Sequence, residues 1–301
     1  MFFTEKMGSN KSGKKTDKEK NLKTVYIIIL ILFLLIDAVG IYILLRNKVV
    51  KSNAQDTYAQ IAESVNSVTI SEYINSEDSV SSDEAQIGSD NPTLQYYGAV
   101  IPEKSLDWEL LHGINEDIYA WICVPGTLVD YPVVQHPSDN EYYLMHNLDG
   151  SYGYPACLYT ENYNSKDFSD YNTVIYGHNM KDGTMFATLH YFETMDISSE
   201  NQFFYIYTED SVRVYLIVGA YQFPAKHLLE DYDMENIYVY EQYLKDMFRL
   251  SYEDTLGVSN MRADTELNMS DRIVTLSTCV NNQDHSYRYL VVGKYLTSEE
   301  Y

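Results

Sequence analysis

The sequence predicts a mainly β protein: a closed barrel of seven or eight short strands with one inserted helix, preceded by one transmembrane helix. Three features predict it: short segments rich in β-branched and aromatic residues, one stretch with apolar residues at helical spacing, and a long apolar run near the N-terminus. Many short strands in one domain are typical of a barrel. The strand segments are WICVPGT (121–127), LVDYPVVQ (128–135), NTVIYGHN (172–179), FFYIYTED (203–210), VRVYLIVGAYQF (212–223), DRIVTLSTC (271–279) and SYRYLVVGKYL (286–296).

The apolar run is VYIIILILFLLIDAVGIYILL, residues 25–45. At about 1.5 Å per residue its length matches the roughly 30 Å of a bilayer's hydrocarbon core. Asp37 costs about 2.5–3.5 kcal/mol near the bilayer centre, which the many Leu, Ile and Val residues offset. Seven Lys precede the run and three basic residues follow it, so the N-terminus is expected in the cytoplasm. A cleaved signal peptide is disfavoured because the apolar core is too long and no clear cleavage site follows it.

Four regions follow from this pattern. Residues 1–24 are a basic cytoplasmic tail, and residues 25–45 anchor the chain in the cell membrane as a single-pass segment. Residues 46–100, rich in Ser, Asp, Glu and Asn, read as an extracellular stalk or linker, helical in its first half and disordered around 76–92. Residues 101–301 form the folded extracellular domain.

Charge excludes one class of function. Residues 52–301 hold 11 of the 21 Lys and Arg and 40 of the 44 Asp and Glu, a net charge of −29. Such a domain is not expected to bind nucleic acid. The negative charge either meets cationic groups, such as the free amines of a cell wall, or keeps a solvated surface soluble, and the second interpretation is favoured.

Two helices are expected in the domain. An entry helix runs from Leu106 to His112, capped by Ser105 or Asp107. The inserted helix covers about 228–250, between two strands. Its apolar residues recur at helical spacing: Ile237, Tyr240, Leu244 and Met247 or Phe248.

The segment TLSTC ends a strand on Cys279, with Thr275, Ser277 and Cys279 on its more polar side. A cysteine nucleophile needs a route to the thiolate, a proton donor for the leaving amine, and positive or N–H groups at the developing oxyanion. If the last two strands form an antiparallel hairpin, Cys279 lies opposite Arg288. The alternative role of Arg288 is to neutralise a local carboxylate such as Asp284.

Seven histidines are candidates for the acid and base. His178 ends the strand in NTVIYGHNM, at a rim of the barrel where loops carry function. His285 lies in the loop between Cys279 and Arg288. Spacing alone does not decide between His178 and His285.

These motifs together resemble a class B sortase. The resemblance covers about residues 105–297, in the order of the family, and places the inserted helix where that class carries one. It is carried by NEDIYAWICVPGTLVDYPVVQ (115–135), YGHNM (176–180), TLSTC (275–279) and Arg288 before YLVVGK (289–294). One departure concerns the residues after the cysteine: some members carry an acid there, whereas this chain has Val280-Asn281-Asn282.

The resemblance implies a sortase-type barrel and a transpeptidase mechanism. Cys279 attacks a Thr carbonyl in a sorting motif near the C-terminus of a secreted protein, and His178 protonates the departing amine. Arg288 stabilises the oxyanion or positions the motif. An amine of the peptidoglycan peptide, or of its lipid-linked precursor, then resolves the thioester with His178 as base.

Substrate-binding roles are assigned to Ser277, Thr278 and Asn179. Ser277 shares the face of Cys279 and either bonds the substrate backbone or is only a hydroxyl on the strand surface. No cofactor is predicted, and no metal either, because HExxH, CxxC and clustered histidines are lacking in the sequence. The loop DGSYGY (149–154) is a weak Ca²⁺ pattern.

Cys123 and Cys157 remain, either as a disulfide or as two small buried hydrophobic residues, and the second interpretation is favoured. Three other functions stay open: a cysteine peptidase that releases the acyl-enzyme to water, a sortase that polymerises pilins, and a non-catalytic adhesin on the same barrel.

Overall fold

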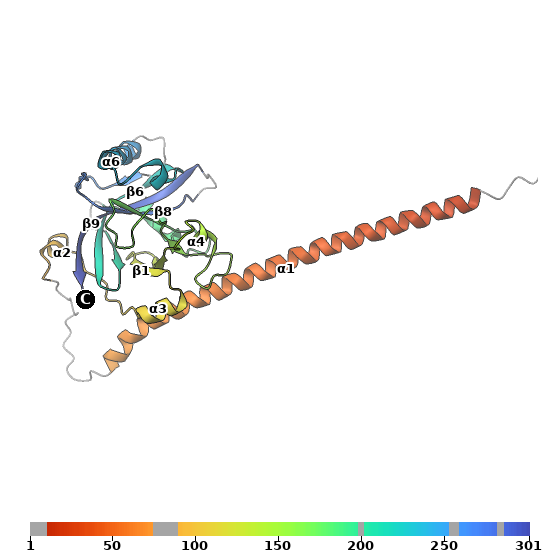
Figure 1. The fold of residues 1–301 in the computed structure, drawn as a ribbon, viewed down its shortest axis with the longest axis horizontal. Helices are drawn as coiled ribbons and strands as arrows, with labels where there is room; N and C mark the ends of the chain where they lie inside the picture. Colours follow the sequence, from red (N-terminus) through yellow and green to blue (C-terminus); the bar gives the residue numbers. More distant parts are fainter. Residues whose placement is uncertain (1–10, 75–89, 198–201, 253–258, 282–285) are drawn as a thin grey trace, which may run out of the picture. The chain divides into compact units, whose positions relative to one another are not determined.

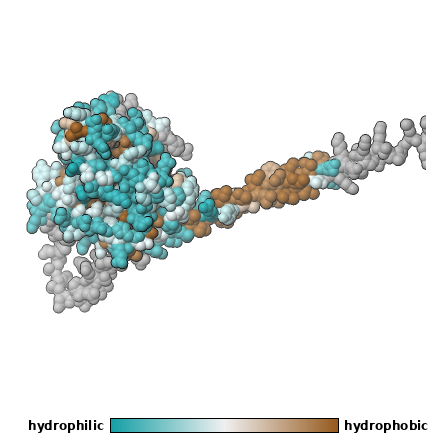
Figure 2. Space-filling model, viewed as in Figure 1, coloured by the Kyte–Doolittle hydropathy of each residue, from teal (hydrophilic) through white to brown (hydrophobic). Residues whose placement is uncertain are grey.

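The computed structural model describes residues 11–74, 90–197, 202–252, 259–281 and 286–301. The chain divides into two compact units, one ending at Val49 and the other comprising Val50–Tyr301. The first unit contains the N-terminal part of helix α1 (Lys11–Ile74). The segment Asn21–Ala62 of this helix is long and apolar enough to cross a membrane, with a mean hydropathy of 3.0 in its most apolar window. Figure 2 shows this apolar surface as a brown band along the helix.

The second unit is built on a closed β-barrel. Among the described residues, eight strands follow one another around it in the order β5-β1-β2-β3-β4-β8-β9-β6, and pairing of β5 with β6 closes the ring. Figure 1 shows β9 and β6 crossing the domain beside β8. The eight strands are β1 (Ile118–Cys123), β2 (Asp130–Val134), β3 (Leu158–Tyr159), β4 (Asn172–Tyr176), β5 (Phe203–Tyr207), β6 (Ser211–Pro224), β8 (Ile273–Cys279) and β9 (Tyr287–Glu300).

Strand β6 closes the barrel because it is long enough to serve two partners on one edge. It pairs with β9 along its length, and its other edge pairs with β5 up to Leu216 and with β7 (Ser259–Met261) from Gly219 to Tyr221. Gly293 of β9 leaves room for the ring of Phe204 inside the barrel, since a Cβ there would lie 2.2 Å from that ring. The predicted closed barrel is confirmed.

The pairing of β4 with β8 determines which end of the barrel carries the candidate site residues. These two strands are parallel, with Tyr176 in register with Ser277, although about one hundred residues separate them in the sequence. Carboxyl ends of parallel strands lie at the same edge of a sheet. The residues that follow β4 and the last residues of β8 therefore meet at one end of the barrel.

All seven predicted strand segments form strands, and both predicted helices are present with shifted ends. The entry helix is α3 (Trp108–Ile114), and the side chain of Asp107, not Ser105, caps it by accepting from the amide of Leu110. The sequence did not predict strands β3 and β7 or the short helices α2 (Pro92–Tyr97) and α4 (Tyr142–Met145). Strands of two or three residues are too short to show an alternating pattern.

The inserted helix begins later than its apolar pattern suggested. Residues Leu228–Asp231 form the short helix α5, and the long helix α6 covers Ile237–Tyr252. The side chain of Asn236 accepts from the amide of Tyr238, so this residue starts a new helix instead of continuing the old one. Helix α6 covers the outer face of the barrel. Its buried residues are Tyr240, Tyr243, Leu244 and Met247.

The part of α1 that follows Val50 belongs to the barrel's unit. The hydroxyl of Tyr58 donates to the carbonyl of Ala156 at 2.9 Å, and Ile61 and Val65 are buried in the cluster that contains Leu111. Lys51 forms an ion pair of 2.7 Å with Asp182. The sequence predicted a stalk or linker over 46–100 and not this packing, because the residues there are mostly polar.

Candidate functional site

Cys279, His178 and Arg288 line one pocket at the edge where β4 and β8 end. The parallel register Tyr176–Ser277 places His178, two residues beyond β4, at the level of Cys279. The antiparallel hairpin supplies the third residue, since Cys279 is the register partner of Arg288 in β9. This pairing confirms the hairpin register predicted from the sequence. The other lining residues are Leu144, Tyr159, Tyr176, Gly177, Ser277 and Thr278.

The His178 ring is held by contacts on two sides. Its Nε2 donates to the carbonyl of Leu144 at 2.7 Å, and the ring of Tyr154 meets it edge-on with centroids 5.0 Å apart. A carbonyl oxygen can only accept, so Nε2 carries a proton and Nδ1 is the ring nitrogen that is free to exchange one. Burial lowers the pKa of His178, and the bond to Leu144 offsets only part of that effect. The neutral imidazole therefore predominates at neutral pH.

Arg288 and Cys279 are both half-buried, which leaves them reachable from solvent yet supported by the sheet. Nη1 of Arg288 donates to the carbonyl of Tyr287 at 3.1 Å, which orients the guanidinium along the strand. A guanidinium opposite the cysteine can supply donors to a developing oxyanion.

A second hollow, called here the side groove, continues from this pocket. It shares Leu144, Tyr159, Tyr176, Ser277 and Arg288 with the pocket and extends to the connection between β6 and α5. Its far part is lined by Asn140, Glu141, Glu161, Tyr163, Phe223, Pro224, Ala225, Lys226, His227, Leu228, Glu230 and Leu290. The pocket and the side groove together offer an extended ligand a continuous path past the thiol.

Three glutamates line the side groove together with the cations Lys226 and Arg288. Glu161 is buried, and its Oε1 accepts from His227 Nε2 at 2.9 Å. Burial raises the pKa of Glu161, while the contact with His227 works in the opposite direction. Glu141 and Glu230 also line the groove.

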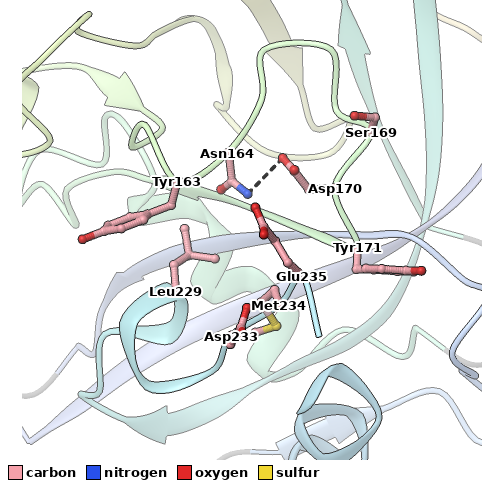
Figure 3. A pocket seen from close by; sticks show the side chains of 9 residues that line it. All are labelled: Tyr163, Asn164, Ser169, Asp170, Tyr171, Leu229, Asp233, Met234 and Glu235. Carbon is pink, nitrogen blue, oxygen red and sulfur yellow. Dashed lines mark hydrogen bonds between the residues drawn. The ribbon is translucent and has the colours of Figure 1, made fainter. Parts of the chain in front are cut away.

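A third hollow lies beside α5 and is drawn in Figure 3. Asn164, on its wall, donates from Nδ2 to Asp170 at 3.2 Å and to the carbonyl of Asn172, and accepts from the amide of Val174. These bonds tie the preceding loop to the start of β4. No cysteine or histidine is among the residues that line this hollow.

The residues predicted to bind substrate lie in three different settings. Ser277 lines both the pocket and the side groove, although its residue is only 6% exposed. Thr278 is 2% exposed, and its Oγ1 has no hydrogen-bond partner among the described residues. Asn179 instead donates from Nδ2 to the carbonyl of Cys279 at 3.1 Å and to Oδ1 of Asn281. Their roles stay predictions. His285 and Asp284 lie outside the described residues.

Sequence reasoning missed two residues of this region, His190 and Glu193. Both belong to the 3₁₀ helix η1 (Ala187–Glu193), and His190 Nε2 lies 3.0 Å from the carbonyl oxygen of Cys279. No sequence signal could have found this contact, because it joins a side chain to a backbone atom 89 positions away.

The remaining cysteines are free thiols. Cys157 is buried, as favoured from the sequence, and Cys123 is half-buried. Burial raises the pKa of Cys123 to about 11 and that of Cys157 to about 12, so both stay protonated and unreactive near neutral pH. Within the described ranges, no group of three or more His, Cys, Asp or Glu side chains converges to hold a metal ion.

Comparisons with known proteins agree with this geometry. The Sortase domain family profile matches residues 122–296. Sortase B of Listeria monocytogenes is 31% identical over 199 residues, which are 62% of this chain and 73% of that protein. The X-ray structure of Clostridium perfringens sortase B is 32% identical, with a TM-score of 0.54, and the match covers 64% of this chain and 100% of that one. The structure of a Staphylococcus aureus sortase B–substrate complex is 27% identical, with a TM-score of 0.53, over 63% of this chain and 84% of that one.

Proposed function

Since this chain belongs to the sortase family of cysteine transpeptidases, in its class B, we propose that it attaches secreted proteins to the cell wall. Its substrates are proteins with a sorting motif near their C-terminus. The enzyme cleaves the motif and transfers the new C-terminus to an amine of the peptidoglycan peptide or of its lipid-linked precursor. One observation carries the assignment: the two strand pairings of β8 bring Cys279, His178 and Arg288 to a single pocket.

In the first half-reaction, Cys279 is the nucleophile and His178 handles the proton. The sulfur forms a bond to the carbonyl carbon of the motif, and the thiol proton passes to Nδ1 of the neutral His178. The tetrahedral intermediate then collapses, the C–N bond breaks, and the protonated His178 gives its proton to the departing amine. A thioester on Cys279 and a released C-terminal fragment are the products.

The burial of His178 suits this cycle. A lowered pKa keeps the ring neutral and able to accept the thiol proton. The same property makes the imidazolium a stronger acid toward the leaving amine. The bond from Nε2 to the Leu144 carbonyl leaves Nδ1 to exchange the proton in both directions.

Arg288 is assigned to the oxyanion. Its position opposite Cys279 places a cation beside the atom whose attack creates negative charge on the substrate oxygen. Charge-assisted donors of this kind gain strength as the oxyanion develops, so they favour the transition state over the bound substrate.

In the second half-reaction, an amine attacks the thioester while His178 removes its proton. The C–S bond breaks, an amide forms, and the proton returns to the sulfur of Cys279. The exposed carboxylates of Glu141 and Glu230 support an amine acceptor, because each can pair with a cationic amine that enters the side groove.

The test is mass spectrometry of the full-length enzyme with a panel of sorting peptides, with and without a peptide amine acceptor. A transpeptidase shows a thioester adduct on Cys279 and, when the amine is added, an amide product in place of the hydrolysed peptide. Hydrolysis that ignores the added amine would instead identify a peptidase. Transfer only to a lysine of a second secreted protein would identify a pilin polymerase.

A further inference from the structure

The backbone carbonyl of Cys279 is held by side chains. Strand β4 ends at Tyr176, and the last backbone bond on that side of β8 runs from the amide of Gly177 to the carbonyl of Ser277. Carbonyls of alternate residues point to the same edge of a strand, so the carbonyl of Cys279 points toward the residues that follow β4. If β4 continued, its backbone would satisfy this oxygen.

Two side chains take the place of that missing strand. Asn179 Nδ2 lies 3.1 Å from the carbonyl oxygen of Cys279, and His190 Nε2 lies 3.0 Å from it. The other ring nitrogen of His190, Nδ1, contacts Oε1 of Glu193. A chain of contacts thus runs from Glu193 through His190 to the peptide group of Cys279.

The ring of His190 is enclosed. The residue is 9% exposed, and its ring stacks on that of Tyr289 with centroids 4.4 Å apart. Tyr289 is the register partner of Thr278, the residue before Cys279. Burying a titratable ring costs free energy unless its polar atoms find partners, and here both nitrogens have them. The ring therefore lies fixed beneath the end of β8.

Chemistry limits how the ring can bond. Carbonyl and carboxylate oxygens only accept, so the imidazolium form donates to both Cys279 and Glu193. A neutral ring with its proton on Nδ1 still donates to Glu193, and its Nε2 accepts from Asn179 Nδ2 at 3.1 Å, which also donates to Cys279. In both forms Glu193 orients the ring, and an N–H group holds the Cys279 carbonyl.

We propose that Glu193, His190 and Asn179 form a positioning relay that fixes the peptide group of Cys279 and so aims its thiol between His178 and Arg288. This inference rests on the proposed role of Cys279 as nucleophile. The three residues touch neither the thiol nor the substrate in this proposal, and they act only through the backbone of Cys279. For Asn179 this role replaces the substrate-binding role predicted from the sequence. Misplacing a reacting group by about 1 Å can cost about a hundredfold in rate, so loss of the relay should lower turnover.

The decisive variant is His190→Phe in the full-length enzyme. Phenylalanine keeps a ring against Tyr289 but has neither a donor for the carbonyl of Cys279 nor an acceptor that orients Asn179 Nδ2. We expect kcat with a sorting peptide to fall about tenfold to a hundredfold while KM changes little. The rate of alkylation of Cys279 by a small neutral reagent should also change little, because that reaction needs an accessible thiol but not its orientation relative to His178 and Arg288. His190→Gln, whose amide offers a donor, should recover part of the lost kcat.

His112 provides a matched control. Its ring also lies between a backbone carbonyl and a carboxylate, with Nε2 at 2.9 Å from the Ile118 oxygen and Nδ1 at 3.5 Å from Glu209, but it does not line the Cys279 pocket. His112→Phe should leave kcat unchanged. Glu193→Ala, which removes the acceptor of His190 Nδ1 and leaves the ring in place, tests the relay with less risk to folding.

The outcomes separate the relay from the proposed function. A folded His190→Phe enzyme with full kcat overturns the relay, and so does a loss of alkylation equal to the loss of kcat. If His190→Phe does not fold, full kcat in Glu193→Ala overturns the relay, whereas a lowered kcat with unchanged alkylation supports it. Cys279→Ala reports on the function itself: an active Cys279→Ala enzyme would refute the nucleophile and the relay together.

Discussion

Cys279 and Arg288 are direct register partners across the β8–β9 hairpin, so the backbone sets their separation. Strand pairing is rigid compared with a loop, which suits a site whose charge stabilisation depends on placement. Each residue needs the hairpin for its position, and the predictions begin with this pair.

Replacing Arg288 should reveal oxyanion stabilisation. Loss of one oxyanion donor typically costs about 10²–10³ in rate, or about 2.7–4 kcal/mol. Arg288→Ala and Arg288→Lys should both lower turnover by about this factor, because lysine lacks the planar fork of donors. The thermal melt should move little. If thiol alkylation fell in step with turnover, Arg288 would act on the thiol instead of the oxyanion.

The pH profile should report the burial of His178. Its neutral form accepts the thiol proton, and burial holds its pKa below the ordinary value of about 6.5. The acidic limb of kcat/KM should therefore have its midpoint below pH 6.5, and His178→Ala should be nearly inactive. An active His178→Ala enzyme together with an inactive His285→Ala enzyme would move the role to His285.

The same burial makes a prediction about stability. A histidine whose pKa is lower in the folded state binds fewer protons there than in the unfolded chain. Its contribution is present above the ordinary value of about 6.5 and is lost as the pH falls through the folded-state pKa. The free energy of unfolding of the wild-type enzyme should fall as the pH drops across that interval. In chemical denaturation at the same pH values, the free energy of unfolding of His178→Gln should fall less. An unchanged pH dependence would contradict the lowered pKa.

Limited alkylation should label one thiol first. Cys279 lines an open pocket, whereas Cys123 and Cys157 are held protonated by pKa values of about 11 and about 12. Peptide mapping after brief treatment with a neutral alkylating reagent should find the adduct on Cys279, and turnover should fall in proportion. The Cys279→Ala variant, treated for the same time, should stay unlabelled. Early labelling of Cys157 would show that the barrel opens more readily than its packing suggests.

Gly293 should resist substitution. A Cβ at this position would lie 2.2 Å from the ring of Phe204, inside the barrel. Gly293→Ala should cost about 1–3 kcal/mol in the free energy of unfolding, the usual range for overpacking. Gly113 of α3 is the matched control, because a Cβ there meets nothing within 4 Å. Gly113→Ala should be neutral or stabilising by up to about 1 kcal/mol in the same denaturant titration.

Membrane topology can be tested directly. If residues 25–45 anchor the chain with its N-terminus inside, protease added to intact protoplasts should digest residues 52–301 and spare the basic tail. Immunoblots against tags at both ends distinguish the two regions. A domain protected from protease would contradict this orientation.

The sequence predicted individual helices and strands better than it predicted which distant segments lie side by side. Richness in β-branched and aromatic residues identified each strand of five or more residues in the described part of the chain. A hairpin needs no long-range information, so the Cys279–Arg288 pair could also be predicted. The meeting of His178 with Cys279 depends on a parallel pairing of strands about one hundred residues apart, which no local pattern encodes. From residues alone, His178 and His285 therefore stayed equivalent.

Other features could not be predicted from the sequence, either because the segment is too short or because a single side-chain bond decides the structure. Strand β3 has two residues and β7 has three, too few for an alternating pattern to repeat. The start of α6 depends on one side-chain bond of Asn236, which competes with continuing the helix. The contact of His190 with the Cys279 carbonyl could not be predicted from the spacing of motifs, because its acceptor is a backbone oxygen, which every residue has.

The long pairing of β9 with β6 and β8 also orders events during synthesis. A ribosome makes residues 172–178 well before residues 287–300, and both segments are needed to hold β8 in place. Until β9 is made and paired, Cys279 has no guanidinium opposite it, even if β8 already lies against β4. Arg288 lies opposite Cys279 only through the β8–β9 pairing, so the candidate site is complete only when β9 has joined the barrel.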